Sequence, residues 1–262
     1  MNLRIVGTGI KPDSQITLQG IRHIKDSKKC LSLVSSVAFS DELKATQIED
    51  IRALYIDGAC DEENYLRITN KVLKELRASQ DISLLVPGHP RVGVTLTQWL
   101  EKVAKEESIN LLISEGISSF DTMINDLGRD PLEKGSVIID ANRLLLFDYP
   151  IIPELDHYIY HICSIGTALT HFKDPSIGNA IDLLRDKLIQ TFPAEHRAVL
   201  ISSSEVDGKL SFQREFMIKD LSSILSGVTF ASSLYIPGTR PKKFNRLFLN
   251  KITDTKKEPR HV

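Results

Sequence analysis

The chain has 262 residues, of which 33 are Lys or Arg and 34 are Asp or Glu, so its formal charge is -1. This length corresponds to one large domain or two small ones. A composition that is 42% apolar and 26% charged excludes a fibrous or disordered chain, and the charge near zero argues against a general nucleic-acid binder.

The cysteines and the lengths of the apolar runs indicate the cellular compartment in which the protein is expected. Cys30, Cys60 and Cys163 are too few and too far apart for a disulfide framework or a cysteine-rich zinc site, and they indicate reduced thiols. The N-terminus lacks the basic region and long apolar stretch of a signal peptide. No apolar run approaches the roughly 18 residues that a membrane span needs. We therefore expect a soluble cytoplasmic protein with no nucleic-acid and no membrane partner.

The first half of the chain alternates between short β-rich runs and helical segments. Strands are predicted at residues 3–6, 30–34, 53–56, 82–86 and 111–114, and helices at 14–27, 61–78 and 95–107. Asp13 or Ser14 is the expected N-cap of the first helix. The second helix begins with acidic residues and ends with basic ones, as the helix dipole favours. Strand–helix alternation with short turns predicts a parallel α/β sheet.

The pattern changes after about residue 115. Strand-like segments at 136–139, 157–163, 198–202, 210–216 and 232–236 dominate there, with one helix at 177–191. We therefore predict an α/β fold with two lobes: a parallel-sheet lobe at 1–116 and a mixed-sheet lobe at 117–252. A hinge at 115–119 and a cleft between the lobes follow from this division. Residues 253–262 are predicted to form a basic tail.

Glycine-containing loops follow several of the predicted strands. Val6-Gly7-Thr8-Gly9 is reminiscent of a dinucleotide-binding turn, but Pro12 stands where a third glycine is needed and no helix follows directly, so NAD binding is not predicted. The loops 87–90 and 115–119 both follow buried strands, where open α/β sheets bind ligands. Each loop taken alone could be a structural turn, and its serines a helix cap. Two such loops at one sheet edge favour a ligand site.

Other candidates have simpler explanations. His157 and His161 have a metal-like spacing, but no carboxylate or cysteine motif supports them, so no metal is predicted. A Ser/His/Asp triad is not predicted either, because the chain has no Gly-x-Ser-x-Gly motif. Tyr65 lies on an apolar helix face and Tyr55 ends the preceding predicted strand. Spacing alone favours a core or edge position for both tyrosines.

The loops, taken in order, resemble those of the tetrapyrrole-methylase superfamily of S-adenosylmethionine-dependent methyltransferases. In that family the first strand runs into Val-Gly-x-Gly, as residues 6–9 do here. A Gly-Asp/His-Pro loop follows the fourth strand, as Gly88-His89-Pro90 does. A Pro-Gly-x-Ser loop follows the fifth strand, where this chain has Glu115-Gly116-Ile117-Ser118-Ser119.

Within the superfamily the chain is most similar to the borosin-type peptide α-N-methyltransferases. The similarity lies in the Gly-His-Pro form of the loop, in the helix start around Tyr65, in residues 161–166 (His-Ile-Cys-Ser-Ile-Gly) and in residues 232–237 (Ser-Ser-Leu-Tyr-Ile-Pro). It extends over about residues 3–252.

This resemblance implies S-adenosylmethionine bound in the cleft between the lobes, held largely by the backbone of loops rich in small residues. The cofactor contacts that it implies are Pro87, Gly88, His89, Pro90, Val92, Val94, Ser118, Ser119, Ile162, Cys163, Ser202, Ser232, Ser233 and Leu234.

The implied reaction makes specific demands. A backbone amide nitrogen is a poor nucleophile because its lone pair is delocalised into the carbonyl. Its methylation needs a close in-line approach, a base that removes the proton, and stabilisation of charge on the oxygen. By resemblance, Tyr65 matches the tyrosine that looks like the base, and Tyr55 roughly matches a second tyrosine upstream.

The chain departs from the family pattern at one position that matters. The family arginine four residues before the helix tyrosine is Asp61 here. An aspartate cannot stabilise an oxyanion, so either Arg67, Arg52 or His89 replaces the arginine or amide methylation is lost.

Three functions therefore stay open. The favoured one is a homodimeric methyltransferase acting on a separate precursor peptide, because the chain ends soon after the last family-like strand. The second is a small-molecule or tetrapyrrole methylase of the same fold, although His89 stands in place of that family's aspartate. The third is a catalytically silent module that binds S-adenosylmethionine, which Asp61 suggests.

Overall fold

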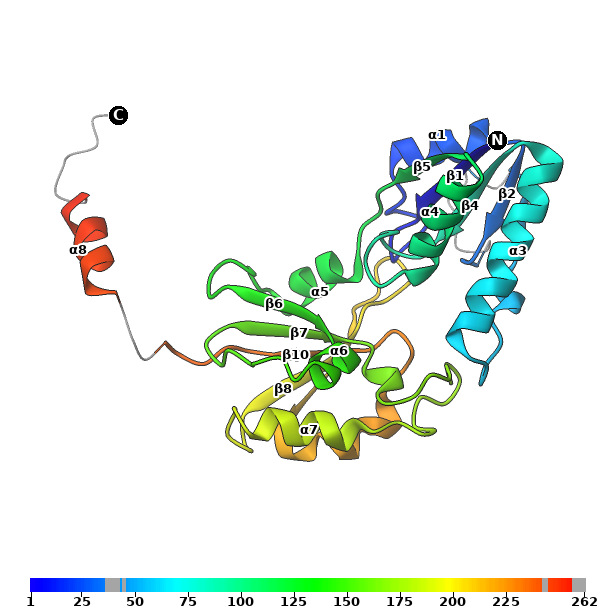
Figure 1. Ribbon diagram of the computed structural model, residues 1–262. Coiled ribbons are helices and arrows are strands. Elements are labelled where there is room, and N and C mark those ends of the chain that lie inside the picture. The colour runs from blue at the N-terminus through cyan, green and yellow to red at the C-terminus, as the bar shows by residue number, and fades with distance from the viewer. Residues whose placement is uncertain (36–42, 44–45, 242–244, 256–262) are drawn as a thin grey trace.

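Each half of the chain builds its own sheet in the computed structural model, which describes residues 1–35, 43, 46–241 and 245–255 (Figure 1). The first sheet has the order β3-β2-β4-β1-β5, and its registered pairs are parallel. Its strands are β1 (Asn2–Gly7), β2 (Lys29–Ser32), β3 (Ile48–Asp50), β4 (Asp81–Val86) and β5 (Asn110–Ser114).

The second sheet is mixed and has the order β6-β7-β10-β8-β9. Only β6 and β7 pair in parallel among its registered neighbours. Its strands are β6 (Ser136–Asp140), β7 (Asp156–Tyr160), β8 (Arg197–Ser202), β9 (Phe212–Met217) and β10 (Ser233–Ile236). The predicted fold class, a parallel-sheet lobe followed by a mixed-sheet lobe, is confirmed. The exact boundaries 1–116 and 117–252 stay a prediction.

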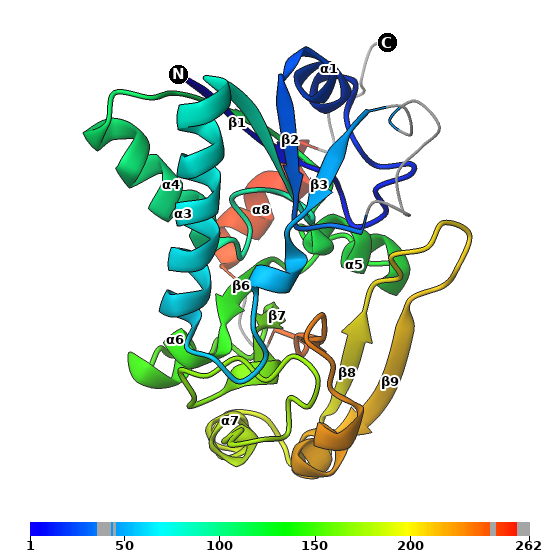
Figure 2. The same cartoon turned by 90° about the vertical axis from the view of Figure 1, so that its right-hand side faces the viewer.

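Helices cover both faces of the first sheet because side chains of its strands alternate between two cores. Leu3 and Ile5 face the core that α3 (Asp61–Ser79) and α4 (Thr95–Glu106) share, whereas Val6 faces the core with α1 (Leu18–Asp26). Figure 2 shows α3 and α4 on one side of the strands and α1 on the other. Burial on both faces is what a parallel sheet requires.

The second sheet is covered in the same way. One core brings α6 (Ala141–Leu146), α7 (Ile181–Ile189) and the 3-10 segment η4 (Ile218–Gly227) against β7, β8 and β10. On the other face, α5 (Ser119–Leu127) packs on Tyr158 and Tyr235. The helix α8 (Arg246–Thr255) stands apart from both lobes in Figure 1. Of the helices in the described residues, none is long and apolar enough to cross a membrane.

Several predicted elements are corrected by the structure. The strand expected at 53–56 is wrong: η2 (Arg52–Leu54) is a 3-10 turn, and the third strand lies earlier, at β3. The first helix begins at Leu18 rather than near residue 14, because the Thr17 side chain, not Asp13 or Ser14, caps it by accepting from Gly20 N (3.0 Å). The strand expected at 157–163 ends at Tyr160, where the next residue turns left-handed and the 3-10 segment η3 (Ile162–Ser164) follows.

The remaining corrections concern lengths and short helices. The helix expected at 177–191 is confined to α7. The helix that the serines of the 115–119 loop could cap is α5, and Ser118 caps it. The helices α6 and α8 and the segment η4 were not predicted. Residues 256–262 of the predicted tail lie outside the described residues.

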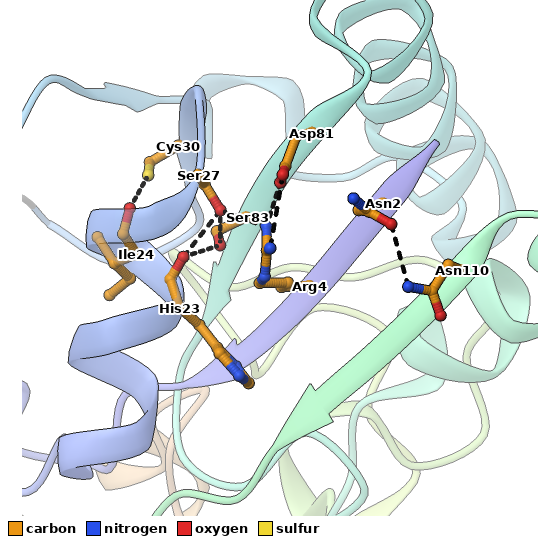
Figure 3. Close-up of polar contacts among 9 residues, drawn as sticks. All are labelled: Asn2, Arg4, His23, Ile24, Ser27, Cys30, Asp81, Ser83 and Asn110. Carbon is orange, nitrogen blue, oxygen red and sulfur yellow. Dashed lines mark hydrogen bonds and ion pairs between the residues drawn. The ribbon is translucent and has the colours of Figure 1, made fainter.

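Polar contacts fix α1 to the sheet (Figure 3). The Ser27 hydroxyl donates to the carbonyl of His23 (2.8 Å) and lies 2.7 Å from the Ser83 hydroxyl on β4. Arg4 on β1 pairs with Asp81 at the start of β4. These contacts hold the amino ends of the central strands in register. The carboxyl ends of the strands are held by contacts between the loops that follow them.

A charged network fastens the edge strand β3 to α3. The Lys29 ammonium lies 2.7 Å from Glu75 and 2.8 Å from Glu49, and Lys71 lies 2.9 Å from Glu75. Hydrogen bonds from Lys29 and then Lys71 lower the pKa of Glu75 from 4.5 to about 2. Because β3 leads into Tyr55 and α3 carries Tyr65, this network holds together the two segments that bear the tyrosines.

The network predicts an acid-dependent contribution to stability. A carboxyl whose pKa is lower in the folded state stabilises the fold above its usual pKa, and this stabilisation is lost as the pH falls through the lowered value. Glu75→Gln should therefore lower the free energy of unfolding at neutral pH, and the difference from wild type should shrink as the pH falls from 4.5 toward 2. Urea unfolding over a pH series measures it. The exposed Glu106→Gln serves as control, and an equal pH dependence in both variants would contradict the assignment.

The loops after β1, β4 and β5 meet backbone to backbone. Gly9 and Gly88 exchange hydrogen bonds, with Gly88 N donating to Gly9 O (2.9 Å) and Gly9 N to Gly88 O (3.3 Å). A Cβ added to Gly116 would lie 2.3 Å from the Gly88 oxygen, and one added to Gly7 would lie 2.7 Å from it. Glycine is required at both positions because no side chain fits between these backbones.

Gly116→Ala should therefore destabilise the fold by about 2–3 kcal/mol, the cost of overpacking a rigid backbone contact. Urea unfolding measures the loss. Gly227→Ala is the matched control: its added Cβ would have its nearest neighbour at 3.7 Å, the movable end of the Arg214 side chain. Equal stabilities of the two variants would show that the strand-end loops can separate without cost.

Candidate active site

A cavity of ≈ 430 Å³ lies between the lobes at the carboxyl ends of the first sheet. The first lobe lines it with residues from 9–12, 33–35 and 87–94 and with Arg52. The second lobe contributes residues from 230–233 and Ser119, Tyr160, His161, Ser203 and Glu205. This position, outside the carboxyl ends of parallel strands, is where α/β sheets bind ligands.

Most of the predicted cofactor residues line this cavity. They are Pro87, Gly88, His89, Val92, Val94, Ser119, Ser232 and Ser233. The agreement follows from the strand-end loops, whose glycines and prolines were visible in the sequence. Their roles as cofactor contacts stay predictions.

The other predicted residues are not among the cavity-lining residues. Pro90 is buried beneath its loop, and Ser118 caps α5 by accepting from Asp121 N (3.3 Å). Ser202 ends β8. The side chains of Ile162, Cys163 and Leu234 belong to the hydrophobic core of the second lobe.

Sequence reasoning did not identify several cavity residues from the second lobe. His161 has a left-handed backbone (φ 57°), and its Nδ1 lies 2.6 Å from the Asp140 carboxylate. Burial raises the pKa of Asp140, but hydrogen bonds from His161 and from the Arg143 amide outweigh it, so the pKa falls. Tyr160 accepts a hydrogen bond from Ser119 (3.2 Å), and burial raises its pKa to about 12. The sequence predicts a strand that continues through residue 163, because the left-handed turn at His161 has no sequence signature.

The two histidines with metal-like spacing do not converge. His157 is buried beside the Phe192 ring (ring centroids 5.8 Å apart), whereas His161 lies at the cavity. Among the described residues, no three His, Cys, Asp or Glu side chains gather as metal ligands would.

The two predicted catalytic tyrosines lie together in an aromatic cluster next to the cavity. The ring centroids of Tyr55 and Tyr65 are 6.2 Å apart, and Trp99 lies 6.1 Å from Tyr65. From the second lobe, Phe172 and Phe230 lie 6.1 and 6.3 Å from Tyr55. Phe230 also lines the cavity, so the cluster and the cavity share a wall.

Both hydroxyls of the tyrosine pair are protonated in this environment. Burial raises the pKa of Tyr55, and the charge of Asp61 adds to this effect. Burial likewise raises the pKa of Tyr65, followed by the charge of Asp61, while hydrogen bonds with Tyr55 and Thr95 oppose the rise. The Tyr55 hydroxyl donates to Asp61 Oδ1 (2.9 Å).

The cations considered as substitutes for the family arginine are engaged elsewhere. The Arg67 guanidinium donates to Asn64 (2.6 Å) and to the Leu54 carbonyl (3.3 Å). Arg52 lines the cavity but pairs with Asp50 (2.7 Å). The Nδ1 of His89 accepts from the Arg91 amide (3.1 Å). The group that lies against the tyrosine pair is the carboxylate of Asp61.

The cavity fits S-adenosylmethionine in size and character. Its volume lies within the usual range for small-molecule sites of roughly 300–1,000 Å³. Its walls combine apolar side chains with serines and with the glycines Gly9, Gly88 and Gly93, which have positive φ. A Cβ on Gly93 would point at the His161 ring, 3.4 Å away, and would narrow the space between the lobes.

Comparison with known proteins agrees with this geometry. The family model of the tetrapyrrole (corrin/porphyrin) methylases matches residues 2–203. The chain belongs to this family, a class of S-adenosylmethionine-dependent methyltransferases, so the predicted family and cofactor are confirmed.

Curated relatives are fungal methyltransferases whose names also include a cyclic-peptide precursor. The gymnopeptide precursor protein of Gymnopus fusipes is 30% identical over 90% of this chain and 57% of its own length. The omphalotin A precursor protein of Omphalotus olearius is 26% identical over 93% of this chain and 59% of its own length. The chain thus spans somewhat more than half the length of these relatives.

Solved structures share the fold. Uroporphyrin-III-C-methyltransferase from Thermus thermophilus superposes with a TM-score of 0.60 at 15% identity, covering 90% of this chain and 91% of that one. A diphthine synthase gives 0.59 at 14% identity, with 97% and 95% coverage.

Filling the cavity should block the donor without unfolding the protein. Ala231→Trp places a large side chain at an exposed position of the cavity wall, so the affinity for S-adenosylmethionine should fall at least tenfold, about 1.4 kcal/mol. Calorimetric titration measures the affinity, and the melting temperature checks the fold. Ala78→Trp, on the exposed end of α3, is the control. Unchanged affinity in Ala231→Trp would place the donor elsewhere.

Proposed function

We propose that this chain is a methyltransferase that uses S-adenosylmethionine to methylate backbone amide nitrogens of a precursor peptide supplied by a separate chain. The observation that carries the proposal is the position of Tyr55 and Tyr65, side by side and next to the donor cavity. The names of the fungal relatives, which join methyltransferase and cyclic-peptide precursor, support the same acceptor class. A homodimer is part of this proposal.

One set of residues would hold the methyl donor, and another would bind the peptide that accepts the methyl group. When bound, S-adenosylmethionine supplies an electrophilic methyl group on a positively charged sulfur. The loops 87–94 and 230–233 would hold it, with Ser119 and His161 at the polar part of the wall. The strand-end backbones are rigid, so they would fix the methyl group in one position, as in-line transfer requires.

The aromatic cluster would receive the peptide. A peptide group is planar, and the rings of Tyr65, Trp99 and Phe172 offer apolar surfaces against which such a plane can lie. The same rings exclude water, which would otherwise solvate the amide and weaken every electrostatic contact in the site. The tyrosine hydroxyls would then contact the N–H group that must lose its proton.

The acceptor decides between this proposal and its alternatives. Purified protein is incubated with S-adenosylmethionine and candidate peptides or, separately, with a uroporphyrin-type tetrapyrrole, and the products are analysed by mass spectrometry. Gains of single methyl groups on peptide backbone nitrogens support the proposal. Methylation of the tetrapyrrole alone would establish the small-molecule methylase, and donor binding without any transfer would establish the silent module.

Tyr65→Phe should lower the single-turnover rate of peptide methylation by about 10²-fold or more, as expected for loss of a positioned acid–base group. The ring and its packing on Trp99 are kept, so donor affinity and melting temperature should stay at the wild-type values. Rapid-quench mass spectrometry follows the rate. Tyr149→Phe, an exposed tyrosine of the second lobe, controls for loss of a hydroxyl elsewhere. Wild-type methylation by Tyr65→Phe would remove the assigned base.

A further inference from the structure

Asp61 lies at the point where the two lobes and the tyrosine pair meet. It is the first residue of α3, and its Oδ1 accepts hydrogen bonds from the hydroxyls of Tyr55 (2.9 Å) and Thr170. Thr170 belongs to the second lobe and is buried. The carboxylate is thus held against Tyr55 by a contact from across the cleft.

Backbone hydrogen bonds lock this arrangement. Gly58 N donates to Thr170 O (2.8 Å), Thr170 N donates to Ala59 O (3.1 Å), and Asp61 N donates to Ala168 O (3.3 Å). The segment that precedes α3 therefore pairs like a short ribbon with residues 168–170. These bonds fix the backbone at the start of α3, and the hydroxyls of Tyr55 and Thr170 hold the Asp61 carboxylate from the two lobes.

The reaction requires a negatively charged group in the site before methyl transfer, because that group must accept the released proton. Methylation of an amide releases a proton, and Tyr55 and Tyr65 are both neutral because burial raises their pKa values. A neutral phenol can pass a proton on but cannot retain an additional one. The nearest group that can take it is the carboxylate to which Tyr55 already donates.

We propose that Asp61 is the final acceptor of the amide proton and acts through the two tyrosines. This inference rests on the proposed function. The acceptor nitrogen forms its bond to the methyl carbon, and the electron pair of the carbon–sulfur bond stays on sulfur. The nitrogen's proton passes to the Tyr65 oxygen, the Tyr65 proton to the Tyr55 oxygen, and the Tyr55 proton to Asp61.

The charges balance in this series of bond changes and proton transfers. A sulfonium cation and a carboxylate anion are present before the transfer, and a thioether and a carboxylic acid are present afterwards. The last step follows the hydrogen bond from Tyr55 to Asp61 (2.9 Å), and the step before it joins two tyrosines whose ring centroids lie 6.2 Å apart. By resemblance, an arginine at this position would stabilise negative charge on the amide oxygen. Asp61 would instead take up the amide proton.

The test compares Asp61→Asn with Asp57→Asn. Asparagine keeps the size of the side chain and an acceptor oxygen but cannot take the proton. Asp57 lies in the same segment and accepts from a backbone amide of the second lobe, Lys173 N (3.0 Å), so its variant removes an equal charge at a similar contact between the lobes. Asp61→Asn should lower kcat by about 10²-fold or more while KM and donor affinity stay unchanged. Asp57→Asn should behave as wild type.

A double-mutant cycle with Tyr55→Phe separates the relay from a structural role. If Asp61 acts through Tyr55, the double variant should be no slower than the slower single variant, because removing either group interrupts the same path. Independent, multiplicative losses would overturn the relay. So would a wild-type kcat in Asp61→Asn, or a loss that appears only in KM and melting temperature.

A third measurement needs no peptide substrate. Tyrosinate absorbance is titrated in the wild type and in Asp61→Asn, and removal of the carboxylate should lower the pH at which the buried tyrosines ionise. No change would overturn the contact on which the relay depends. Failure of the wild type to methylate any peptide would instead overturn the proposed function, and the relay with it.

Discussion

The structure depends on a contact between backbones at the carboxyl ends of β1, β4 and β5. Gly9 and Gly88 exchange hydrogen bonds, and Gly116 packs against the Gly88 carbonyl with no room for a side chain. This contact brings the loops of three separate strands to one place. The loops after β1 and β4 line the cavity, and the loop after β5 leads into α5, whose first residue, Ser119, lines it as well. The position of the cavity is therefore a direct consequence of how closely the strand ends approach.

The acceptor side depends on a different kind of contact. Tyr55 and Asp61 come from the first lobe, whereas Thr170, Phe172 and Phe230 come from the second, and the side chains meet across the cleft. Such a site exists only when the lobes are joined. The backbone pairing of residues 58–61 with residues 168–170 supplies that junction, so the positions of the tyrosine hydroxyls and of the donor loops are fixed by one arrangement of the lobes.

This difference explains what the sequence could and could not predict. The donor loops carry their own signals: glycine and proline after a buried strand mark a turn at a sheet edge, as at Gly88. The cavity residue His161 and the wall residue Phe230 carry none, because a left-handed turn and a contact between distant segments leave no local pattern. The strand expected at 53–56 failed for a related reason. Its apolar residues look β-like, but Asp50 accepts from the Arg52 amide (2.9 Å) and starts a 3-10 turn.

The two halves of the site therefore differ in how many substitutions their contacts allow. The strand-end loops tolerate few substitutions at Gly7 and Gly116, because a side chain at either position would meet neighbouring backbone atoms. An acceptor half made of side chains can change one residue at a time. The acceptor half also holds a carboxylate, that of Asp61, which accepts a hydrogen bond from Tyr55. Under the proposed function, a carboxylate at this position would favour the loss of a proton from the acceptor rather than the gain of negative charge on its oxygen.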